Sequence, residues 1–277
     1  MQPLELGVCT WAIDRNDAAN AIRLTRDKLN LAVAQIGMFG RSAISTLNPD
    51  AIRSAADSAG VTLSALFVGF DGDDFTSVST IARTAGFGNP ETLDERLSLV
   101  GRAASIATDI GLKLLAAHWG CIPHSPSSPD FGRLRDNVCR AVEICAERGI
   151  TLLAETGAEP AEALREFIER ITVAPTGVNF DPANFVAHAT GDPVKAVTIL
   201  ADRIQQVHVK DVSAPADSAR RRGDIAALGS GDANIPRVIS KLRARGYTGP
   251  LLLERKGAAE NLDPLREDLD FLRSMLS

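Results

Sequence analysis

Short apolar runs alternate along the whole chain with segments that repeat an apolar residue every three or four positions. The first pattern is typical of buried β-strands and the second of amphipathic helices. Strands are predicted over residues 4–9, 31–36, 61–68, 111–118, 150–155, 176–181, 204–210 and 251–254. Helices are predicted between and after them, over residues 16–29, 49–60, 91–110, 133–148, 164–171, 193–202, 235–242 and 265–272.

Individual helix signals support this assignment. Residues 164–171 place their large apolar side chains on one helix face. Asn48 and Pro49 are the residue types favoured at a helix N-cap and in its first turn, so a helix is predicted to begin there. Gly60 is predicted to end it.

The order of these elements predicts the fold. Strands that each precede a helix must run parallel, because every helix returns the chain to the same end of the sheet. Eight such units predict an α/β protein of the (β/α)₈ TIM barrel class, with residues 1–277 as a single domain. Such barrels take about 250 residues, which fits this length. An open doubly wound sheet is the nearest alternative, but no G-x-G-x-x-G sequence follows the first strand.

Two long polar segments interrupt the alternation, at residues 69–90 and 212–231. Loops longer than about 12–15 residues in a compact domain tend to be functional or mobile. The first segment contains Asp71-Gly-Asp-Asp, which lacks the later ligands and the glutamate of a calcium-binding EF-hand loop. Both segments are therefore predicted to be loops, and no calcium site is expected.

Charge bears on the class of partner. The chain has 35 acidic and 30 basic residues and a formal net charge of −5. Proteins that bind a phosphate backbone usually have a basic balance or a basic stripe, so nucleic acid is not an expected partner. The run Arg220–Arg222 is predicted to lie in a solvated loop, and His124 and His188 are expected at the surface.

Cysteine usage and hydropathy bear on the compartment. The cysteines are Cys9, Cys121, Cys139 and Cys145, with no C-x-x-C pair and no histidine at zinc-finger spacing. Core packing as free thiols is the main expectation for them, with an active-site contact as the alternative for Cys9 and Cys121, which lie near predicted strand ends. No signal peptide is seen, and no stretch approaches the roughly 18 apolar residues of a membrane span. A cytoplasmic protein with no membrane partner is expected.

Four of the predicted strands end in a residue that can bind a divalent metal: Glu155, Asp181, His208 and Glu254. Successive members are 26, 27 and 46 residues apart, as expected when one strand–helix unit, or one with a long loop, separates them. The carboxyl ends of the strands of a (β/α)₈ barrel face a shared pocket. A single carboxylate there is more often a cap or turn residue, but the joint pattern over consecutive strands predicts one metal site.

The composition of this set indicates the cofactor. Carboxylates gathered in one pocket repel one another unless a cation lies between them, so one divalent metal ion is predicted. The oxygen-rich set favours Mn²⁺ or Mg²⁺, with Mn²⁺ as the first choice, and the histidine leaves Co²⁺ or Zn²⁺ as alternatives. A ligand set smaller than an octahedral complement leaves positions for the hydroxyl and carbonyl oxygens of a substrate.

Further residues are candidate substrate contacts. His118 ends the fourth predicted strand, where a packed structural histidine is an equal alternative. Side chains alternate along a strand, so Lys210 is expected to join His208 inside the barrel, although it can also simply balance charge. Lys256 follows by the same alternation. Trp11, just past the first strand, can form a wall for a sugar ring or cap the barrel core.

The same residues suggest a reaction. A bound metal can polarise a substrate carbonyl and acidify the neighbouring C–H bond, and a carboxylate can then remove that proton to give a metal-stabilised enediolate. Glu155 and Glu254 lie on different strands and can approach the substrate from different faces, which makes them the predicted catalytic pair. Return of the proton on the opposite face gives epimerisation, and return to the adjacent carbon gives aldose–ketose isomerisation. Loss of a β-hydroxyl gives dehydration.

Five motifs resemble those of the xylose-isomerase-like TIM barrel superfamily, which includes sugar phosphate isomerases and epimerases, inosose dehydratases and endonuclease IV. They are Ala154-Glu155-Thr156, Asn179-Phe-Asp181-Pro-Ala-Asn184, Val207-His208-Val-Lys210-Asp211, Gly229-Ser-Gly231-Asp232 and Leu253-Glu254-Arg255, and the resemblance covers essentially the whole chain. It implies that the four strand-end residues hold one Mn²⁺-like ion, and that Glu155 and Glu254 form the acid–base pair of an epimerase. It also implies a carbohydrate as the small-molecule substrate.

The chain departs from this superfamily at two points. Many members have a histidine three residues after the aspartate of the sixth strand, and this chain has Asn184 there. By the resemblance that position contacts the substrate, so Asn184 is a candidate substrate contact. The asparagine disfavours an endonuclease IV-like phosphodiesterase, which needs a multi-zinc cluster. The arginine that often follows the histidine of the seventh strand has only Arg220–Arg222 as loose candidates.

The leading hypothesis is therefore a metal-dependent isomerase or epimerase of a sugar, keto-sugar or polyol. A dehydratase or lyase of a keto-polyol such as an inosose is the alternative. An endonuclease IV-like phosphodiesterase and a binding protein without catalytic activity have less support. The sequence leaves open which sugar is bound, whether it is phosphorylated, and whether the chain forms a homo-oligomer.

Overall fold

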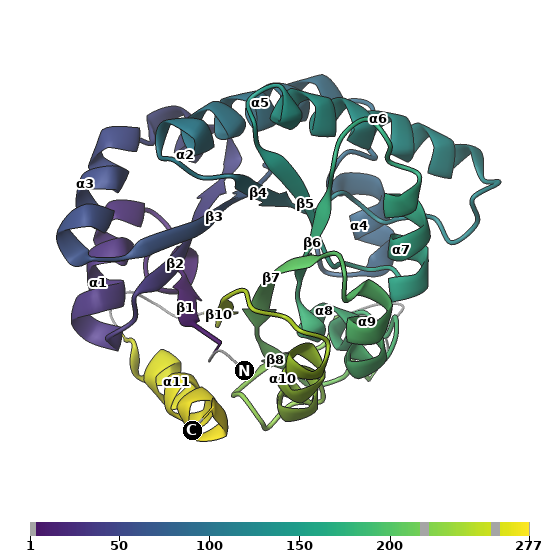
Figure 1. Ribbon diagram of the computed structural model, residues 1–277. Helices are drawn as coiled ribbons and strands as arrows, with labels where there is room; N and C mark the ends of the chain where they lie inside the picture. Colours follow the sequence, from purple (N-terminus) through teal and green to yellow (C-terminus); the bar gives the residue numbers. More distant parts are fainter. Residues whose placement is uncertain (1–3, 217–221, 256–260, 277) are drawn as a thin grey trace.

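The computed structural model describes residues 4–216, 222–255 and 261–276. Eight parallel strands close into a barrel in the order β1-β10-β7-β6-β5-β4-β3-β2, which confirms the predicted (β/α)₈ fold. Figure 1 shows these strands in the centre and the helices around them. The barrel strands are β1 (Leu6–Cys9), β2 (Val33–Phe39), β3 (Thr62–Gly69), β4 (Leu114–Ala117), β5 (Thr151–Glu155), β6 (Gly177–Phe180), β7 (Ile204–Val209) and β10 (Leu251–Leu253).

A main helix follows each strand and buries its apolar face against the barrel. The main helices are α1 (Ala18–Leu29), α3 (Pro49–Ala59), α5 (Leu93–Asp109), α6 (Pro129–Ala146), α7 (Ala161–Glu169), α9 (Pro193–Leu200), α10 (Ile235–Ala244) and α11 (Asp263–Leu276). On α7 the apolar stripe predicted from the sequence is buried, including Leu164 and Phe167. Asn48 accepts hydrogen bonds from the backbone N–H groups of Asp50 and Ala51, which confirms the predicted start of α3.

The structure also contains short elements that the sequence pattern did not predict. They are η1 (Thr10–Ala12), α2 (Gly40–Thr46), α4 (Val78–Thr84), α8 (Pro182–Ala187), β8 (Asp211–Val212) and β9 (Ile225–Ala226). Each lies between a barrel strand and the main helix that follows it. All of them are therefore at the carboxyl end of the barrel, where a (β/α)₈ fold builds its sites.

Helix α4 corrects the prediction that residues 69–90 form only a loop. Ser77 begins this helix with a capping box: its Oγ accepts from Thr80 N at 3.2 Å, and Thr80 Oγ1 accepts from Ser77 N at 3.0 Å. Only Ile81 is buried on this short helix, so no apolar repeat marks it in the sequence.

The second segment predicted to be a loop, residues 212–231, also contains regular structure. Val212 of β8 pairs with Ile225 of β9 in an antiparallel ladder. The part of this segment at residues 217–221 lies outside the described residues. Ile225 is exposed in this hairpin. The sequence of β8 and β9 therefore lacks the clear alternation of apolar and polar residues by which a strand is predicted.

The interior of the barrel mixes polar and apolar contacts. Ser64 Oγ of β3 donates a hydrogen bond to Gln206 Oε1 of β7 at 3.0 Å, across the barrel. Phe67 and Leu153 are buried in one apolar cluster, and Leu252 of β10 is fully buried. Since these apolar side chains fill the interior, the carboxyl end is closed from below.

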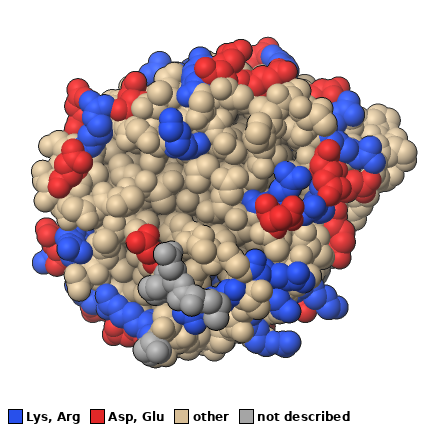
Figure 2. Space-filling view, in the orientation of Figure 1, with Lys and Arg blue, Asp and Glu red and all other residues tan. Residues whose placement is uncertain are grey.

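The surface and the helices bear on the expected partners. Charged side chains of both signs lie round the edge of the face that Figure 2 shows, and its middle is mostly uncharged. Within the described ranges, no helix has both the length and the apolar character needed to cross a membrane. Two residues of the predicted basic run, Arg220 and Arg221, lie outside the described residues.

Candidate functional site

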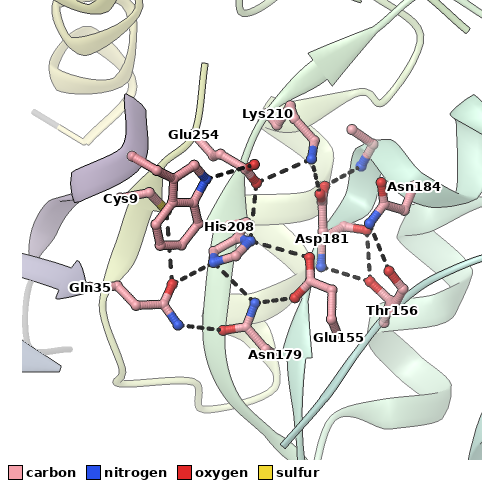
Figure 3. A network of polar contacts seen from close by, with 12 residues as sticks. Cys9, Gln35, Glu155, Thr156, Asn179, Asp181, Asn184, His208, Lys210 and Glu254 are labelled. Carbon is pink, nitrogen blue, oxygen red and sulfur yellow. Dashed lines mark hydrogen bonds and ion pairs between the residues drawn. The ribbon is translucent and has the colours of Figure 1, made fainter. Parts of the chain in front are cut away.

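Four side chains meet at the carboxyl end of the barrel interior. Glu155 ends β5, Asp181 follows β6, His208 lies in β7 and Glu254 follows β10. One ligand atom from each lies within 4.8 Å of the others. Figure 3 shows these side chains pointing toward one another. The structure thus brings together the four residues that the strand ends in the sequence indicate.

This cluster can hold a metal ion. Asp181 Oδ2 is buried and faces the cluster. A buried carboxylate oxygen is costly unless a cation compensates it, and a metal ion bound by this oxygen would do so. Its close cation here is Lys210, whose Nζ lies 2.5 Å away in an ion pair.

The second carboxylate oxygen and the backbone groups of Asp181 make hydrogen bonds that hold the surrounding chain in place. Its Oδ1 accepts a hydrogen bond from Ala183 N at 2.9 Å and caps α8, and Pro182 takes the first helical position. Its backbone N–H donates to Thr156 Oγ1 at 2.8 Å, and the same hydroxyl donates to Asp181 O at 2.9 Å. One aspartate therefore both belongs to the cluster and begins the helix that the sequence pattern did not predict.

The ring of His208 has a fixed orientation. Its Nε2 lies 2.5 Å from Gln35 Oε1, which can only accept a hydrogen bond, so Nε2 carries the proton. Its Nδ1 lies 3.2 Å from Glu155 Oε1 and 3.2 Å from Glu254 Oε2. In this structure Nδ1 donates to these carboxylates, which favour the protonated ring, and loss of the Nδ1 proton would free a lone pair to bind a metal in the cluster.

Gln35 and Asn179 form a second polar layer with Cys9 below the cluster, which sequence reasoning missed. Gln35 Nε2 donates to Asn179 Oδ1 at 3.4 Å, and Cys9 Sγ donates to Gln35 Oε1 at 3.8 Å. The Asn179 amide also contacts Glu155 Oε2. The alternation of side chains contained a signal for Asn179, since it precedes Asp181 by two positions on the same strand face.

Lys210 and Trp11 both contact Glu254. Lys210 Nζ lies 3.1 Å from Glu254 Oε2, and Trp11 Nε1 donates to Glu254 Oε1 at 3.1 Å. Burial alone would raise the pKa of Glu254, but the Lys210 charge and the hydrogen bonds from His208 and Trp11 hold this pKa well below its usual value. Burial opposes the charge of Lys210, but Asp181 and Glu254 raise its pKa, so Lys210 stays protonated.

The predicted Lys256 lies outside the described residues. The inward position of Lys210, by contrast, is as the alternation along β7 predicts. The structure places its ammonium between two carboxylates, so charge balance accounts for its position without a substrate. A substrate contact by Lys210 stays a prediction.

The cluster opens into a cavity of about 840 Å³. Aromatic side chains from the loops and ends of β1 to β3 form one wall, namely Trp11, Phe39, Phe67 and Phe75. The ring centroids of Trp11 and Phe67 are 5.3 Å apart, and those of Trp11 and Phe39 are 5.5 Å apart. Trp11 therefore lines the cavity and also packs on the apolar interior, which unites the two alternatives predicted for it.

His118 lies in the same cavity, directly after β4. Its ring is 4.5 Å from that of Phe75 and 5.9 Å from that of Phe67. Burial, and then the positive charge of Lys210, lower the pKa of His118 to about 3. This histidine is neutral at physiological pH, and its contact with a substrate stays a prediction.

Asn184 also lines the cavity, on the first turns of α8. Its side-chain Nδ2 donates to Thr156 O at 2.7 Å and ties α8 to the end of β5. The amide nitrogen is thus engaged in the scaffold. A substrate contact by Asn184 stays a prediction.

His188 corrects the expectation that it lies at the surface. It is only 7 % exposed and lines the cavity at the end of α8. The expectation failed because α8 is too short to give an apolar repeat, and it turns this residue inward. His124 is exposed as expected, and Arg222, one of the loose arginine candidates, lines the cavity.

The motif at residues 229–232 has a structural role through Asp211. The two carboxylate oxygens of Asp211 accept four backbone N–H groups, from Val212, Gly229, Gly231 and Ala233. A Cβ at Gly231 would lie 2.3 Å from Asp211 Oδ1, so only glycine fits this close approach. Asp211 therefore shapes the loop between β9 and α10 rather than facing the cluster.

A closed (β/α)₈ barrel with three carboxylates, a histidine and a lysine converging at its carboxyl end defines a class of barrel whose strand ends form a polar cluster that could hold a metal ion. Within this class, the chain belongs to the xylose isomerase-like TIM barrel family, whose model matches residues 20–275.

The three relatives described next each share less than 30% sequence identity with this chain. The chain is 24% identical over 264 residues to the inosose dehydratase of Geobacillus kaustophilus (strain HTA426), covering 83% of this chain and 80% of that protein. It is similar to the structure of a xylose isomerase domain protein from Planctomyces limnophilus, with 28% identity, a TM-score of 0.82, and coverage of 99% and 98% of the two chains. The D-allulose 3-epimerase of Methylomonas sp. shares the fold, with 14% identity, a TM-score of 0.72 and 99% coverage of each chain.

Proposed function

We propose that this protein is a metal-dependent isomerase or epimerase of a sugar, keto-sugar or polyol, acting by proton transfer next to a carbonyl. The observation that supports this most directly is the placement of Glu155 and Glu254. One oxygen of each lies 3.2 Å from the same nitrogen of His208, and the two side chains come from β5 and β10. Two carboxylates that meet from different sides of one site are suited to move a proton between the faces of a substrate.

The metal centre of this proposal consists of Glu155, Asp181, His208 and Glu254. A divalent ion held there supplies a Lewis acid for a carbonyl oxygen. Mn²⁺ is the first choice and Mg²⁺, Co²⁺ and Zn²⁺ are alternatives, because the set contains three oxygen ligands and one imidazole.

The two glutamates differ in access. The Glu155 side chain is 2% exposed and that of Glu254 is 21% exposed, so Glu254 is the more open to a substrate in the cavity. The hydrogen bond from Trp11 fixes the orientation of the Glu254 carboxylate. The ammonium of Lys210 supplies a fixed positive charge beside both Glu254 and Asp181.

The cavity supports a carbohydrate as the small-molecule substrate. Its volume of about 840 Å³ lies within the roughly 300–1,000 Å³ of small-molecule sites. The aromatic wall supplies an apolar surface for the C–H face of a sugar, and it limits the access of water to the carboxylates. Substrate hydroxyls face the polar side chains across from this wall.

Deuterium exchange tests the proposed reaction. The Mn²⁺-loaded protein is incubated in D₂O with a panel of ketoses and keto-polyols, and we expect deuterium at a carbon next to a carbonyl. Glu155→Gln and Glu254→Gln keep the shape of each side chain and remove its basicity, so each is expected to lower exchange by roughly a hundredfold or more. Glu162→Gln, on the exposed face of α7, is the matched control. Exchange at the wild-type rate in both site variants would contradict the mechanism.

Metal analysis tests the cofactor separately. Protein purified without chelator is expected to contain a divalent ion, or to gain exchange activity when Mn²⁺ is added. Fewer than about one ion per two chains, together with no response to Mn²⁺, would contradict a metal site.

A dehydratase of a keto-polyol is the second candidate, and the 24% identity to an inosose dehydratase supports it. The first step is the same proton removal, and a β-hydroxyl is lost in the next one. An unsaturated ketone absorbance and the loss of one water in the product mass would favour this reaction over isomerisation. The free thiols of all four cysteines support a cytoplasmic location for either enzyme.

A further inference from the structure

The cavity has a basic wall that adjoins its aromatic wall, since the His118 ring lies 4.5 Å from that of Phe75. His118 follows β4, His188 ends α8 after β6, and Arg222 precedes β9 after β7, and all three line the cavity. These loops flank the end of β5, which contributes Gly157 and Ala158 to the lining. Two such small residues leave room between the basic side chains for a group of the substrate.

His188 has unused hydrogen-bonding capacity in this wall. It is 7 % exposed, and its Nδ1 has no hydrogen-bond partner within the described residues. A buried polar atom without a partner costs free energy, and a ligand that supplies the partner recovers it. Lining the cavity, His188 is in a position to receive such a ligand.

Arg222 is held in place by its backbone. Its N–H donates to Thr76 O at 3.0 Å, and the next residue, Gly223, donates to Ala187 O at 2.9 Å. The first contact ties the segment to the loop before α4, and the second ties it to the residue that precedes His188. In Figure 1, α8 and β8 lie side by side at this point. The position of Arg222 beside the end of α8 is thus part of the scaffold.

The basic groups act on one another. Burial, and then the positive charges of His118, Arg222 and Lys210, lower the pKa of His188 to about 4. Arg222 and Lys210 act in the same direction on His118. An anion bound among these groups would offset the positive charge of Arg222 and Lys210 felt at the two histidines, while a neutral hydroxyl would not. Lys210 is already paired with Asp181 and Glu254, so Arg222 is the residue of this wall that supplies positive charge for an anion.

We propose that His118, His188 and Arg222 form a subsite for an oxyanion of the substrate, so that the substrate is a sugar acid or a sugar phosphate. Arg222 supplies the charge, and the two neutral histidines supply N–H donors. This inference rests on the proposed function, in which the carbonyl end of the same substrate lies at Glu155 and Glu254.

Three ketoses that differ only at C6 test the subsite: D-fructose with a hydroxymethyl group, D-fructuronate with a carboxylate, and D-fructose 6-phosphate. Their dissociation constants are measured by calorimetry on the Mn²⁺-loaded protein at fixed ionic strength. We expect at least one anionic ketose to bind ten- to a hundredfold more tightly than fructose, because its oxyanion makes charge-assisted hydrogen bonds that a hydroxyl does not. Which of the two binds more tightly distinguishes a carboxylate from a phosphate.

Substitutions test which residues cause the preference for the anionic ketose. Arg222→Gln and His188→Gln are each expected to reduce the preference for the anionic ketose by tenfold or more. Arg15→Gln is the matched control, because Arg15 lines the same cavity beside Phe39 and loses the same charge. Arg222 is exposed, so its variant is expected to fold even where that of the buried His188 does not. Equal affinities for the three ketoses, or a preference that survives in Arg222→Gln, would overturn the subsite.

Calorimetry needs no turnover, so this test is separate from that of the reaction. Deuterium exchange in Glu155→Gln and Glu254→Gln decides whether the carboxylates transfer a proton. A protein that exchanges deuterium but binds all three ketoses equally would keep the proposed function and lose the subsite. A protein that prefers the anionic ketose without exchange would keep the subsite and lose the proposed function.

Discussion

Trp11 Nε1 donates a hydrogen bond to Glu254 Oε1 at 3.1 Å, although 243 positions separate the two residues in sequence. The bond joins the first and last strands of the barrel at the site, since β1 and β10 are neighbours. The bond links Trp11 of the aromatic wall directly to Glu254 of the proposed acid–base pair. A change in the indole therefore affects the carboxylate directly.

Trp11→Phe is expected to keep the aromatic wall and to lose this hydrogen bond. Hydrogen bonds to charged groups contribute roughly 1.5–3 kcal/mol, so kcat is expected to fall about ten- to a hundredfold in the deuterium-exchange assay. Trp119→Phe is the control, because the buried Trp119 Nε1 has no hydrogen-bond partner in the described part of the chain. Similar losses in both variants would mean that ring size, and not the hydrogen bond, matters.

Lys210→Gln is expected to make the fold more dependent on metal. Removing the ammonium leaves Asp181 and Glu254 without their cation, and breaking a buried ion pair costs about 3–5 kcal/mol. In chelator the Tm is expected to fall by about 5–10 °C. Added Mn²⁺ is expected to raise the Tm by more than in the wild type, because the ion takes over the neutralisation. Lys195→Gln, at an exposed position, should show neither effect.

Glu159→Gln is expected to stabilise the protein at high pH only. Burial raises the pKa of Glu159 from 4.5 to about 7, so the folded state binds a proton there more tightly than the unfolded state does. The contribution of this group to stability is therefore fully present below pH 4.5 and is lost as pH rises through about 7. Glutamine stays neutral and can still accept the Gly157 N–H, which lies 3.0 Å from Glu159 Oε1.

Urea unfolding in chelator measures this effect. At pH 8 the variant is expected to gain about 2–3 kcal/mol over the wild type, and at pH 4.5 the two should agree. Glu162→Gln, at an exposed position on α7, controls for the change in net charge. A gain of equal size at both pH values would exclude ionisation of Glu159 as its cause.

Gly231→Ala is expected to destabilise the loop that Asp211 holds. The new methyl group would lie 2.3 Å from Asp211 Oδ1 and 2.7 Å from Val212 O, which is closer than van der Waals contact permits. We expect a loss of about 1–3 kcal/mol in urea unfolding. Gly132→Ala is the counterpart, because Gly132 lies in α6 with open space around it and alanine favours a helix by about 1 kcal/mol. Equal stability of both variants would contradict the close approach.

Much of the fold could be predicted because it depends on local patterns. Apolar runs and helical spacing marked the eight barrel strands and their main helices, and Asn48 marked a helix start through its own backbone contacts. The four residues of the cluster could be found for the same reason. Each ends a strand, and the barrel topology brings strand ends together.

The residues that escaped prediction depend on contacts between distant parts of the chain. Gln35 orients the ring of His208 from 173 positions away, and nothing near Gln35 in sequence indicates it. His188 faces the cavity only because Asp181 and Pro182 begin a six-residue helix, which is too short for an apolar repeat. A residue whose position is set by a short element at the carboxyl end of the barrel has no local signature.

The pairing of β1 with β10 has a consequence for the synthesis of the protein. Leu6 and Leu251 are neighbours in the closed sheet, and Glu254 follows β10 by one residue. A nascent chain therefore exposes the free edges of β1 and β7 until β10 has left the ribosome, and such edges favour aggregation. The same segment completes both the sheet and the four-residue cluster proposed to bind a metal. Chains that stop short of it should be recognisable to chaperones and proteases, and they should lack the full affinity for metal.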